Sequence, residues 1–261
     1  MKGAVCMKSY KGYLIDLDGT MYRGSEQIAE AAGFIDELRQ RNIPYLFVTN
    51  NSSRTPAQVA EKLRNFGIET DNKQVFTTSM ATANFIAERK ADATVYVIGE
   101  EGIRNALQEK GLELVEENAD FLVMGIDRAI DYEKLTKACL VVRNGAAFIS
   151  TNGDIAIPTE RGLQPGNGAI TSVVAVSTQV KPIFIGKPES IIIEQALQVL
   201  GVSKEEVIMV GDNYDTDIMA GINAGMDTLL VHTGVTKKEH LLQYEKQPTF
   251  VVDTLADWQF E

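Results

Sequence analysis

Short apolar runs alternate with segments of helical periodicity along most of the chain. Residues 13–15 and 45–48 are continuous apolar runs of strand length, and between them apolar residues recur at helical spacing over 27–41. A second helix is expected over 56–66, with Pro56 in its first turn. The C-terminal third repeats the pattern, with strands expected at 183–185, 207–210, 228–231 and 251–252 and helices between them. This alternation predicts an α/β fold built on a parallel sheet.

The middle of the chain has a strand and helix pattern of its own. Strands are expected at 95–98, 121–124 and 147–149, and helices at 101–110 and 132–143. We therefore expect an inserted α/β domain over 83–178. The main domain is then discontinuous and consists of residues 1–82 and 179–261.

Composition narrows the class of protein. Hydrophobic residues make up 44% of the chain and charged residues 23%, which is typical of a globular protein. The net charge of −11 works against binding to nucleic acid or to an anionic membrane, so neither is expected as a partner. The two cysteines offer no disulfide framework and fit a reducing compartment.

The N-terminus and the apolar runs bear on localisation. No apolar run approaches the roughly 18 residues needed to span a bilayer, and the first residues lack the apolar stretch of a signal peptide. A cytoplasmic location is expected. Met7 is a second possible start, so residues 1–6 are either the native start of the chain or dispensable.

The strongest local motif is Asp16-Leu17-Asp18-Gly19-Thr20, directly after the first apolar run. Two carboxylates this close raise each other's pKa unless a positive charge lies near them. A hard cation with oxygen ligands, such as Mg2+, suits such a pair. An ordinary turn rich in Asp and Gly would look the same, so the motif alone leaves both readings open.

Polar residues also follow three other predicted strands. Thr49 follows 45–48, Lys187 follows 183–185, and Asp212 follows 207–210. In open parallel sheets, ligands bind at the carboxyl ends of the strands. We therefore expect these groups and the Asp16 motif to converge on one crevice.

These four motifs, in this order, resemble those of the haloacid dehalogenase (HAD) superfamily. The position of the insert resembles the C2-capped branch of NagD-like and p-nitrophenyl phosphatases. The resemblance covers essentially the whole chain, and it implies a Rossmann-like parallel-sheet core with an inserted α/β cap of the C2 type. It further implies a Mg2+-dependent phosphatase that hydrolyses small phosphate monoesters through an aspartyl-phosphate.

The resemblance also implies a role for each motif residue. Asp16 would be the nucleophile, and Asp18 the general acid that later activates water. Mg2+ would be held by the Asp16 carboxylate, the Asp18 backbone carbonyl and the Asp212 carboxylate. Thr49 and Lys187 would bind the phosphoryl oxygens. An acid at position 18 favours phosphoryl transfer over dehalogenation, because a halide leaves without a proton.

Four further residues have more than one interpretation. Asp217 and Asn213 are expected to hold the metal ligands in place, although a carboxylate at a helix start is also stabilised by the helix dipole. Asn50 and Asn51 are expected to contact substrate, yet they also suit a simple turn. The loops at 150–154 and 165–168 could face the substrate or could be ordinary surface loops.

Competing functions remain open at the level of the sequence. A phosphotransferase or phosphomutase would use the same aspartyl-phosphate, and a non-catalytic ligand-binding protein could keep the fold. A cap that closes over the crevice favours a small phosphorylated metabolite, such as a sugar phosphate or a nucleotide. Caps of this branch often pair, so a homodimer is expected from the resemblance alone.

Overall fold

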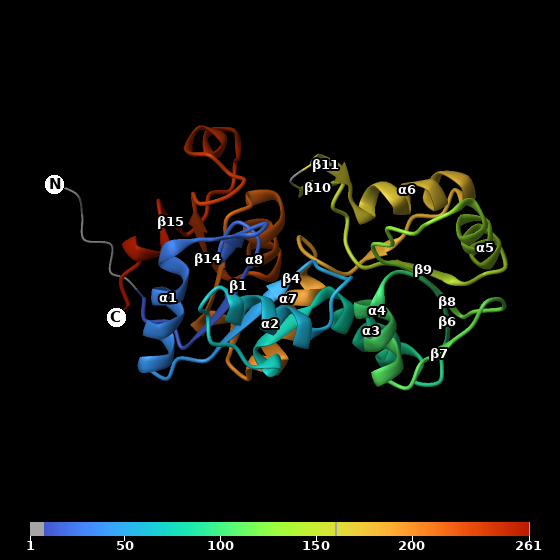
Figure 1. Cartoon of the computed structure of the whole chain (residues 1–261), viewed down its shortest axis with the longest axis horizontal. Coiled ribbons are helices and arrows are strands. Elements are labelled where there is room, and N and C mark those ends of the chain that lie inside the picture. Colours follow the sequence, from blue (N-terminus) through green and yellow to red (C-terminus); the bar gives the residue numbers. More distant parts are fainter. Residues whose placement is uncertain (1–7, 160, 261) are drawn as a thin grey trace.

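The computed structural model describes residues 8–159 and 161–260, so the expectation for residues 1–6 lies outside the described part of the chain. Two lobes lie side by side (Figure 1). The first lobe holds both ends of the chain, and the second lobe is formed by the middle of the sequence. Each lobe is built around its own parallel sheet.

The sheet of the first lobe has six strands in the order β15-β14-β13-β1-β4-β5, and every pairing is parallel. Its strands are β1 (Gly12–Ile15), β4 (Tyr45–Thr49), β5 (Val75–Thr77), β13 (Val207–Gly211), β14 (Asp227–Val231) and β15 (Phe250–Val252). Strand order reverses at β1, whose neighbours are β13 and β4. In such a sheet the crevice for a ligand opens at this switch point.

Successive side chains of these strands point into two different hydrophobic layers, as the twofold period of a strand requires. Ile15 and Val210 face the layer covered by α1 (Ala29–Gln40) and α2 (Pro56–Asn65). On the other face, Leu14 and Met209 pack with residues of three helices. These are α3 (Thr78–Arg89), α7 (Ser190–Leu200) and α8 (Met219–Ala224). The sheet is therefore covered by helices on both faces, and the predicted α/β fold with a parallel sheet is confirmed.

The sheet of the second lobe has the order β12-β9-β8-β6-β7 and is also parallel. Its strands are β6 (Thr94–Ile98), β7 (Glu113–Leu114), β8 (Phe121–Met124), β9 (Ala147–Ser150) and β12 (Ile183–Phe184). The helices of this lobe are α4 (Glu101–Glu109), α5 (Tyr132–Arg143) and α6 (Asn167–Thr178).

One predicted strand lies in a different sheet from the one expected. The run 183–185 was expected in the core sheet, but Ile183 and Phe184 pair with Ile149 and Ser150 of β9 in the second lobe. An apolar run shows that a segment is buried, but it does not show which sheet the segment joins. The chain therefore returns to the first lobe only after β12.

The two lobes share hydrophobic packing at their junction. One cluster of buried side chains runs from Leu14 and Met209, through Phe85 and Ile86 of α3, to Val95 and Val97 of β6. The predicted boundary at 82/83 falls inside α3, and the one at 178/179 falls at the end of α6. The division of the chain into a core and a cap stays a prediction.

Smaller elements complete the fold. Two short antiparallel hairpins, β2 (Tyr22–Arg23) with β3 (Glu26–Gln27) and β10 (Ala156–Thr159) with β11 (Gly162–Pro165), extend from the two lobes. Short 3-10 helices lie at Asn72–Gln74, Lys204–Glu206, Lys238–Gln243 and Leu255–Asp257, and a π-helical turn at Tyr214–Ile218. Within the described residues, no helix is long and apolar enough to cross a membrane.

Candidate active site

Two carboxylates end neighbouring strands at the switch point of the sheet. Asp16 follows β1 directly, and Asp212 follows β13 directly. The two strands pair in parallel, and the Asp16 N–H extends the ladder by donating to the Val210 carbonyl at 2.9 Å. Pairing of β1 with β13 thus brings together two motifs that are almost 200 residues apart in sequence.

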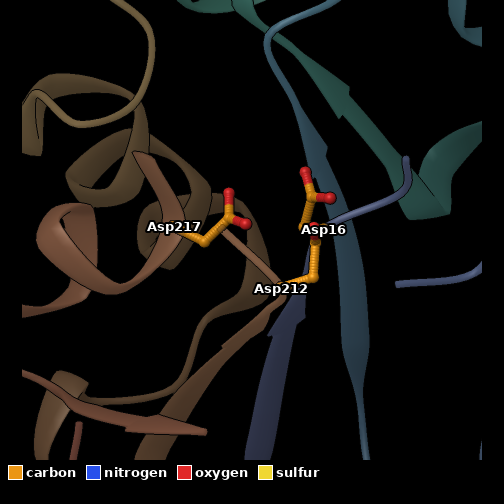
Figure 2. A group of neighbouring side chains, drawn as sticks. All are labelled: Asp16, Asp212 and Asp217. Atoms are coloured by element: carbon orange, nitrogen blue, oxygen red, sulfur yellow. The ribbon is translucent and has the colours of Figure 1, made fainter. Parts of the chain in front are cut away.

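Asp217 joins these two residues from the π-helical turn that follows β13. Side-chain oxygens of Asp16, Asp212 and Asp217 all lie within 4.8 Å of one another, and all three residues are buried. Figure 2 shows the three side chains gathered beside the ends of the two strands. The prediction that Asp217 holds the metal ligands in place, and is not itself a ligand, stays a prediction.

Lys187 places a single ammonium among these carboxylates. Its Nζ contacts Asp16 Oδ1, lies 2.7 Å from Asp217 Oδ1 and donates to the Val48 carbonyl at 3.0 Å. The Lys187 side chain is 2% exposed. Asp217 therefore forms an ion pair inside the site. Stabilisation by the helix dipole alone would not require this ion pair.

Burial and mutual repulsion dominate the electrostatics of the group. Burial, followed by the charges of Asp217 and Asp212, raises the pKa of Asp16 well above its ordinary value, against the opposing effect of Lys187. Burial and the charge of Asp217 raise the pKa of Asp212 to about 7. Burial alone would disfavour the Lys187 ammonium, but the carboxylates of Asp16 and Asp217 raise its pKa above the ordinary value. The lysine therefore stays charged.

These observations test whether a cation fits the site. One ammonium cannot neutralise three buried carboxylates, and the raised pKa values of Asp16 and Asp212 express this imbalance. Carboxylate oxygens are the donors that Mg2+ prefers. The donor set, its burial and its excess negative charge therefore suit a divalent metal ion.

Asp18 lies at the mouth of the site, where its side chain reaches solvent. Partial burial of its carboxyl raises its pKa above the ordinary value, with a smaller opposing effect from Lys62. A raised pKa suits a carboxyl group that must donate a proton near neutral pH. The turn after Asp18 is held by the Gly19 N–H, which donates to the Tyr22 carbonyl at 2.6 Å. Gly19 has a φ of +96°, in the left-handed region that favours glycine.

A cavity of about 260 Å3 connects these residues. All nine residues predicted for the site line this cavity. They lie at the ends of strands or in the loops that follow: Asp16, Asp18, Thr49, Asn50, Asn51, Lys187, Asp212, Asn213 and Asp217. The Lys187 strand lies in the other sheet, yet its side chain still enters the same cavity. The predicted convergence of the four motifs on one crevice is therefore what the fold produces.

The loop after β4 is held by its own side chains. The Asn51 N–H donates to Thr49 Oγ1 at 3.1 Å, and Asn51 Oδ1 accepts from the N–H groups of Ser53 and Arg54 at 3.0 and 2.9 Å. Asn51 thus serves as a turn residue, the alternative left open by the sequence. The Asn50 amide donates to the Lys187 carbonyl at 2.9 Å and to Asp154 Oδ2 at 3.2 Å.

Asn213 has a comparable local role. Its N–H donates to Asp217 Oδ2 at 3.0 Å, and its Oδ1 accepts from the Asp215 N–H at 3.1 Å. These contacts fix the orientation of the Asp217 carboxylate.

The second lobe adds polar and apolar groups to the same cavity. Asn152, Asp154 and Asn167 line it together with Ile126 and Ile157. Asp154 accepts hydrogen bonds from the Asn50 and Asn152 amides, and its burial raises its pKa despite them. The loops at 150–154 and 165–168 therefore contribute residues to the cavity, and their contact with substrate stays a prediction.

Sequence reasoning did not identify the groups that hold Asp212. Thr20 Oγ1 donates to Asp212 Oδ1 at 3.3 Å, and the Val235 N–H donates to Asp212 Oδ2 at 2.7 Å. The signal available was the position of Thr233-Gly234-Val235 just after the strand 228–231, at the same edge of the sheet as the four motifs.

Known proteins match the chain over nearly its full length. Residues 13–113 match the family described as haloacid dehalogenase-like hydrolase, and residues 184–258 the family described as HAD-hydrolase-like. The 5'-nucleotidase YutF of Bacillus subtilis is 68% identical over 252 residues, which cover 97% of this chain and 98% of that protein. An acid sugar phosphatase of Staphylococcus aureus is 56% identical over 245 residues, or 94% of this chain and 95% of that protein.

Solved structures agree with the sequence comparisons. The structure of a double mutant of the thermostable NPPase from Geobacillus stearothermophilus matches with a TM-score of 0.93 and 60% identity, covering 98% of this chain and all of that one. The p-nitrophenyl phosphatase from Archaeoglobus fulgidus matches with a TM-score of 0.91 and 37% identity, over 96% and 98% of the two chains. The chain therefore belongs to the haloacid dehalogenase-like hydrolases, in the branch of NagD-like and p-nitrophenyl phosphatases, and is a phosphoric monoester hydrolase.

Proposed function

We propose that the protein hydrolyses small phosphate monoesters with Mg2+, through a phosphoryl group carried transiently on Asp16. The observation that carries this proposal is the arrangement of Asp16, Asp18 and Lys187 around one cavity. These three residues supply a buried carboxylate, a more exposed acid with a raised pKa and a buried ammonium.

In the first step, a carboxylate oxygen of Asp16 attacks phosphorus as the bond from phosphorus to the leaving oxygen breaks. Asp18 donates its proton to that leaving oxygen, so the product departs as a neutral alcohol. The contact with the Lys187 ammonium holds the Asp16 carboxylate in one orientation. Confining the nucleophile in this way lowers the entropic cost of reaching the transition state.

In the second step, the Asp18 carboxylate takes a proton from water as the water oxygen attacks the acyl-phosphate. The bond from phosphorus to Asp16 breaks, inorganic phosphate leaves, and both carboxyl groups return to their initial states. One residue thus serves both half-reactions as acid and then as base.

Lys187 and Thr49 are proposed to bind the phosphoryl oxygens. Both side chains line the cavity beside Asp16, and Lys187 remains charged because its neighbours are carboxylates. A fixed ammonium in a buried site stabilises the negative charge of the transition state more strongly than it would in water.

The Asp16 and Asp212 carboxylates and the Asp18 backbone carbonyl are proposed to hold Mg2+, with Asp217 beside them. When bound, Mg2+ would offset the charge of the carboxylates and of the phosphoryl oxygens. Asn213 and Lys187 would keep Asp217 oriented through the contacts already described.

The substrate is proposed to be a phosphate ester of a sugar, either free or as part of a nucleotide. A cavity of about 260 Å3 admits a small metabolite but not a folded protein. Asn152 and Asp154 offer the amide and carboxylate groups that bind hydroxyls. Names of the two relatives, 5'-nucleotidase and acid sugar phosphatase, point to esters whose phosphate is attached to a sugar.

The remaining expectations are part of this proposal. We place the enzyme in the cytoplasm, a location supported by its cysteine content. A homodimer is supported by the resemblance alone.

The test is hydrolysis of p-nitrophenyl phosphate by the wild type and by Asp16→Asn, each with Mg2+ and with EDTA. We expect the wild type to hydrolyse the substrate with Mg2+ but not with EDTA, and the variant to hydrolyse it under neither condition. Multiple turnover by purified Asp16→Asn would show that another residue is the nucleophile. Release of nitrophenol that depends on an added alcohol, with phosphate transferred to it, would instead indicate a phosphotransferase.

5'-Mononucleotides and sugar phosphates are the next substrates to compare. Acid quenching during turnover, followed by mass spectrometry, is expected to find one phosphoryl group on the peptide that contains Asp16. A peptide that stays unmodified while substrate is consumed would contradict the covalent intermediate.

A further inference from the structure

The Asp212 carboxylate is enclosed by backbone from two sides. Asp212 is fully buried, and both of its side-chain oxygens accept hydrogen bonds from protein groups. A Cβ added at Gly19 would lie 2.3 Å from Asp212 Oδ2, and one added at Gly234 would lie 1.9 Å from the same atom. Real Cβ atoms do not make contacts this short. A side chain at either position would therefore displace the carboxylate.

The two glycines differ in what requires them. Gly19 has φ +96°, so the backbone of its turn disfavours other residues whatever the space around it. Gly234 is not among the glycines with positive φ, so no left-handed backbone conformation requires glycine there. The three atoms nearest to a Cβ at position 234 all belong to the Asp212 side chain, so this contact is the reason that the structure gives for glycine there.

The segment that contains Gly234 is anchored on both sides of Asp212. Thr233 Oγ1 donates to the Gly19 carbonyl at 2.7 Å, and the Arg23 side chain donates to the Thr233 carbonyl. On the other side, the Thr236 N–H donates to the Asp212 carbonyl at 3.1 Å, and Thr236 Oγ1 accepts from the Tyr214 N–H at 2.8 Å. Gly234 and Val235 therefore cannot shift without disturbing the turn at Gly19 or the start of the π-helical turn.

We propose that Gly234 and Val235 are positioning residues of the metal site. Gly234 leaves the space that the Asp212 carboxylate fills, and the Val235 N–H fixes Oδ2 so that the remaining lone pairs face Asp16 and Asp217. This inference rests on the proposed role of Asp212 as a metal ligand. It assigns the orientation of the Asp212 carboxylate to a segment outside the four motifs. Val235 also lines the cavity, so the same residue borders the space for the substrate.

The test compares Gly234→Ala with Gly33→Ala in the full-length protein. Gly33 lies in α1, and a Cβ there would meet no described atom within 4 Å, so it matches the substitution without the contact. Mg2+ binding is measured by isothermal titration calorimetry, without substrate. Groups that orient metal ligands typically contribute 10- to 100-fold to affinity, so Gly234→Ala is expected to raise the Kd for Mg2+ by about that factor. Gly33→Ala is expected to leave the Kd unchanged.

Two results would separate the inference from the proposal on which it rests. If the wild type binds no Mg2+, the proposed metal site fails. If the wild type binds Mg2+ and Gly234→Ala binds it equally well, the metal site stands and the positioning role of Gly234 is wrong.

A second comparison covers the case in which Gly234→Ala does not fold. Asp212→Ala removes the carboxylate that the new methyl group would meet, so the double variant Gly234→Ala/Asp212→Ala is expected to regain cooperative urea unfolding. The loss of stability caused by Gly234→Ala is likewise expected to be smaller in the Asp212→Ala background than in the wild type. An equal loss in both backgrounds would show that Gly234 is required for another reason, and would overturn the inference.

Discussion

The Lys187 ammonium lies 2.7 Å from the Asp217 carboxylate, and both side chains are only 2% exposed. Asp16 contacts the same ammonium, so one lysine pairs with two buried carboxylates from different elements. Removing one partner of a buried ion pair leaves an uncompensated charge, which is strongly destabilising. This contact therefore serves folding as well as the proposed chemistry.

Lys187→Met is expected to abolish turnover and to lower the free energy of unfolding by about 3–5 kcal/mol without Mg2+. Urea denaturation measures the loss, and addition of Mg2+ is expected to recover part of it because the cation supplies positive charge. Lys181→Met, six residues away and exposed, is the control and should change neither quantity. Full stability of Lys187→Met without metal would contradict the ion-pair argument.

Asp18→Asn is expected to lower kcat for sugar phosphates by about 10²- to 10⁴-fold, the usual contribution of a general acid. With p-nitrophenyl phosphate, whose leaving group needs little protonation, the first step should be less affected than the second. Stopped-flow measurement is then expected to show a burst of nitrophenol as phosphorylated enzyme accumulates. Wild-type steady-state turnover by this variant would mean that another acid and base act.

Mg2+ is expected to stabilise the folded protein, because the three clustered carboxylates are brought together only by folding. At a Mg2+ concentration 100 times its Kd, linkage predicts a gain of about 2.7 kcal/mol in the free energy of unfolding. Urea titrations with Mg2+ and with EDTA measure the gain. Asp212→Asn should show little of it, and an equal gain in that variant would place the bound ion elsewhere.

Asp154→Asn is expected to raise KM for sugar phosphates and 5'-nucleotides by roughly tenfold or more, the range for loss of a hydrogen bond to a charged group. The variant keeps the size of the side chain and an oxygen that can accept from Asn50. KM for p-nitrophenyl phosphate, which has no hydroxyls on its leaving group, should change little. Equal increases for both kinds of substrate would show that Asp154 holds the site together instead of contacting the sugar.

Gly102→Ala probes the contact between the two lobes. Gly102 lies in the first turn of α4, its N–H donates to the Ser53 carbonyl at 2.9 Å, and a Cβ there would lie 2.5 Å from the Arg54 carbonyl oxygen. Alanine normally favours a helix, and Gly33→Ala in α1 is expected to add about 0.5–1 kcal/mol of stability. Gly102→Ala is expected to lower stability by about 1–3 kcal/mol, because the junction is already filled.

Urea denaturation compares the two glycine variants directly. Opposite signs for Gly102→Ala and Gly33→Ala would support the tight junction. A gain in stability from both would show that the loop after β4 can move away from α4.

The sequence predicted the convergence of its polar motif residues on one cavity better than it predicted the sheets. Asp16, Thr49 and Asp212 each end an apolar run, and parallel strands bring their carboxyl ends to one edge, so their convergence follows from local pattern. The run at 183–185 is equally apolar, but its pairing with β9 depends on the path of the chain through the second lobe. Periodicity holds no information about that path.

Residues that act through the backbone were the least predictable. Val235 contributes a backbone N–H group, and Gly234 leaves space because it has no side chain. Neither property can be recognised from the residue type in the sequence. Asp154 was visible only as a member of a polar loop, because its hydrogen bond from Asn50 comes from the other lobe. Such contacts arise from tertiary structure and can be assigned only once the lobes are placed.

The loop after β4 is bonded to the second lobe at several points. Ser52 Oγ accepts from the Ile126 N–H at 3.1 Å, the Ser53 carbonyl accepts from Gly102, and the Asn50 amide reaches Asp154. A chimera that receives the second lobe of a relative would keep these bonds only if that lobe placed the same backbone N–H groups, and an acceptor at position 154, against residues 50–54. An exchange of the second lobe between relatives therefore has to preserve the fit of that lobe to the edge of the sheet that bears Thr49.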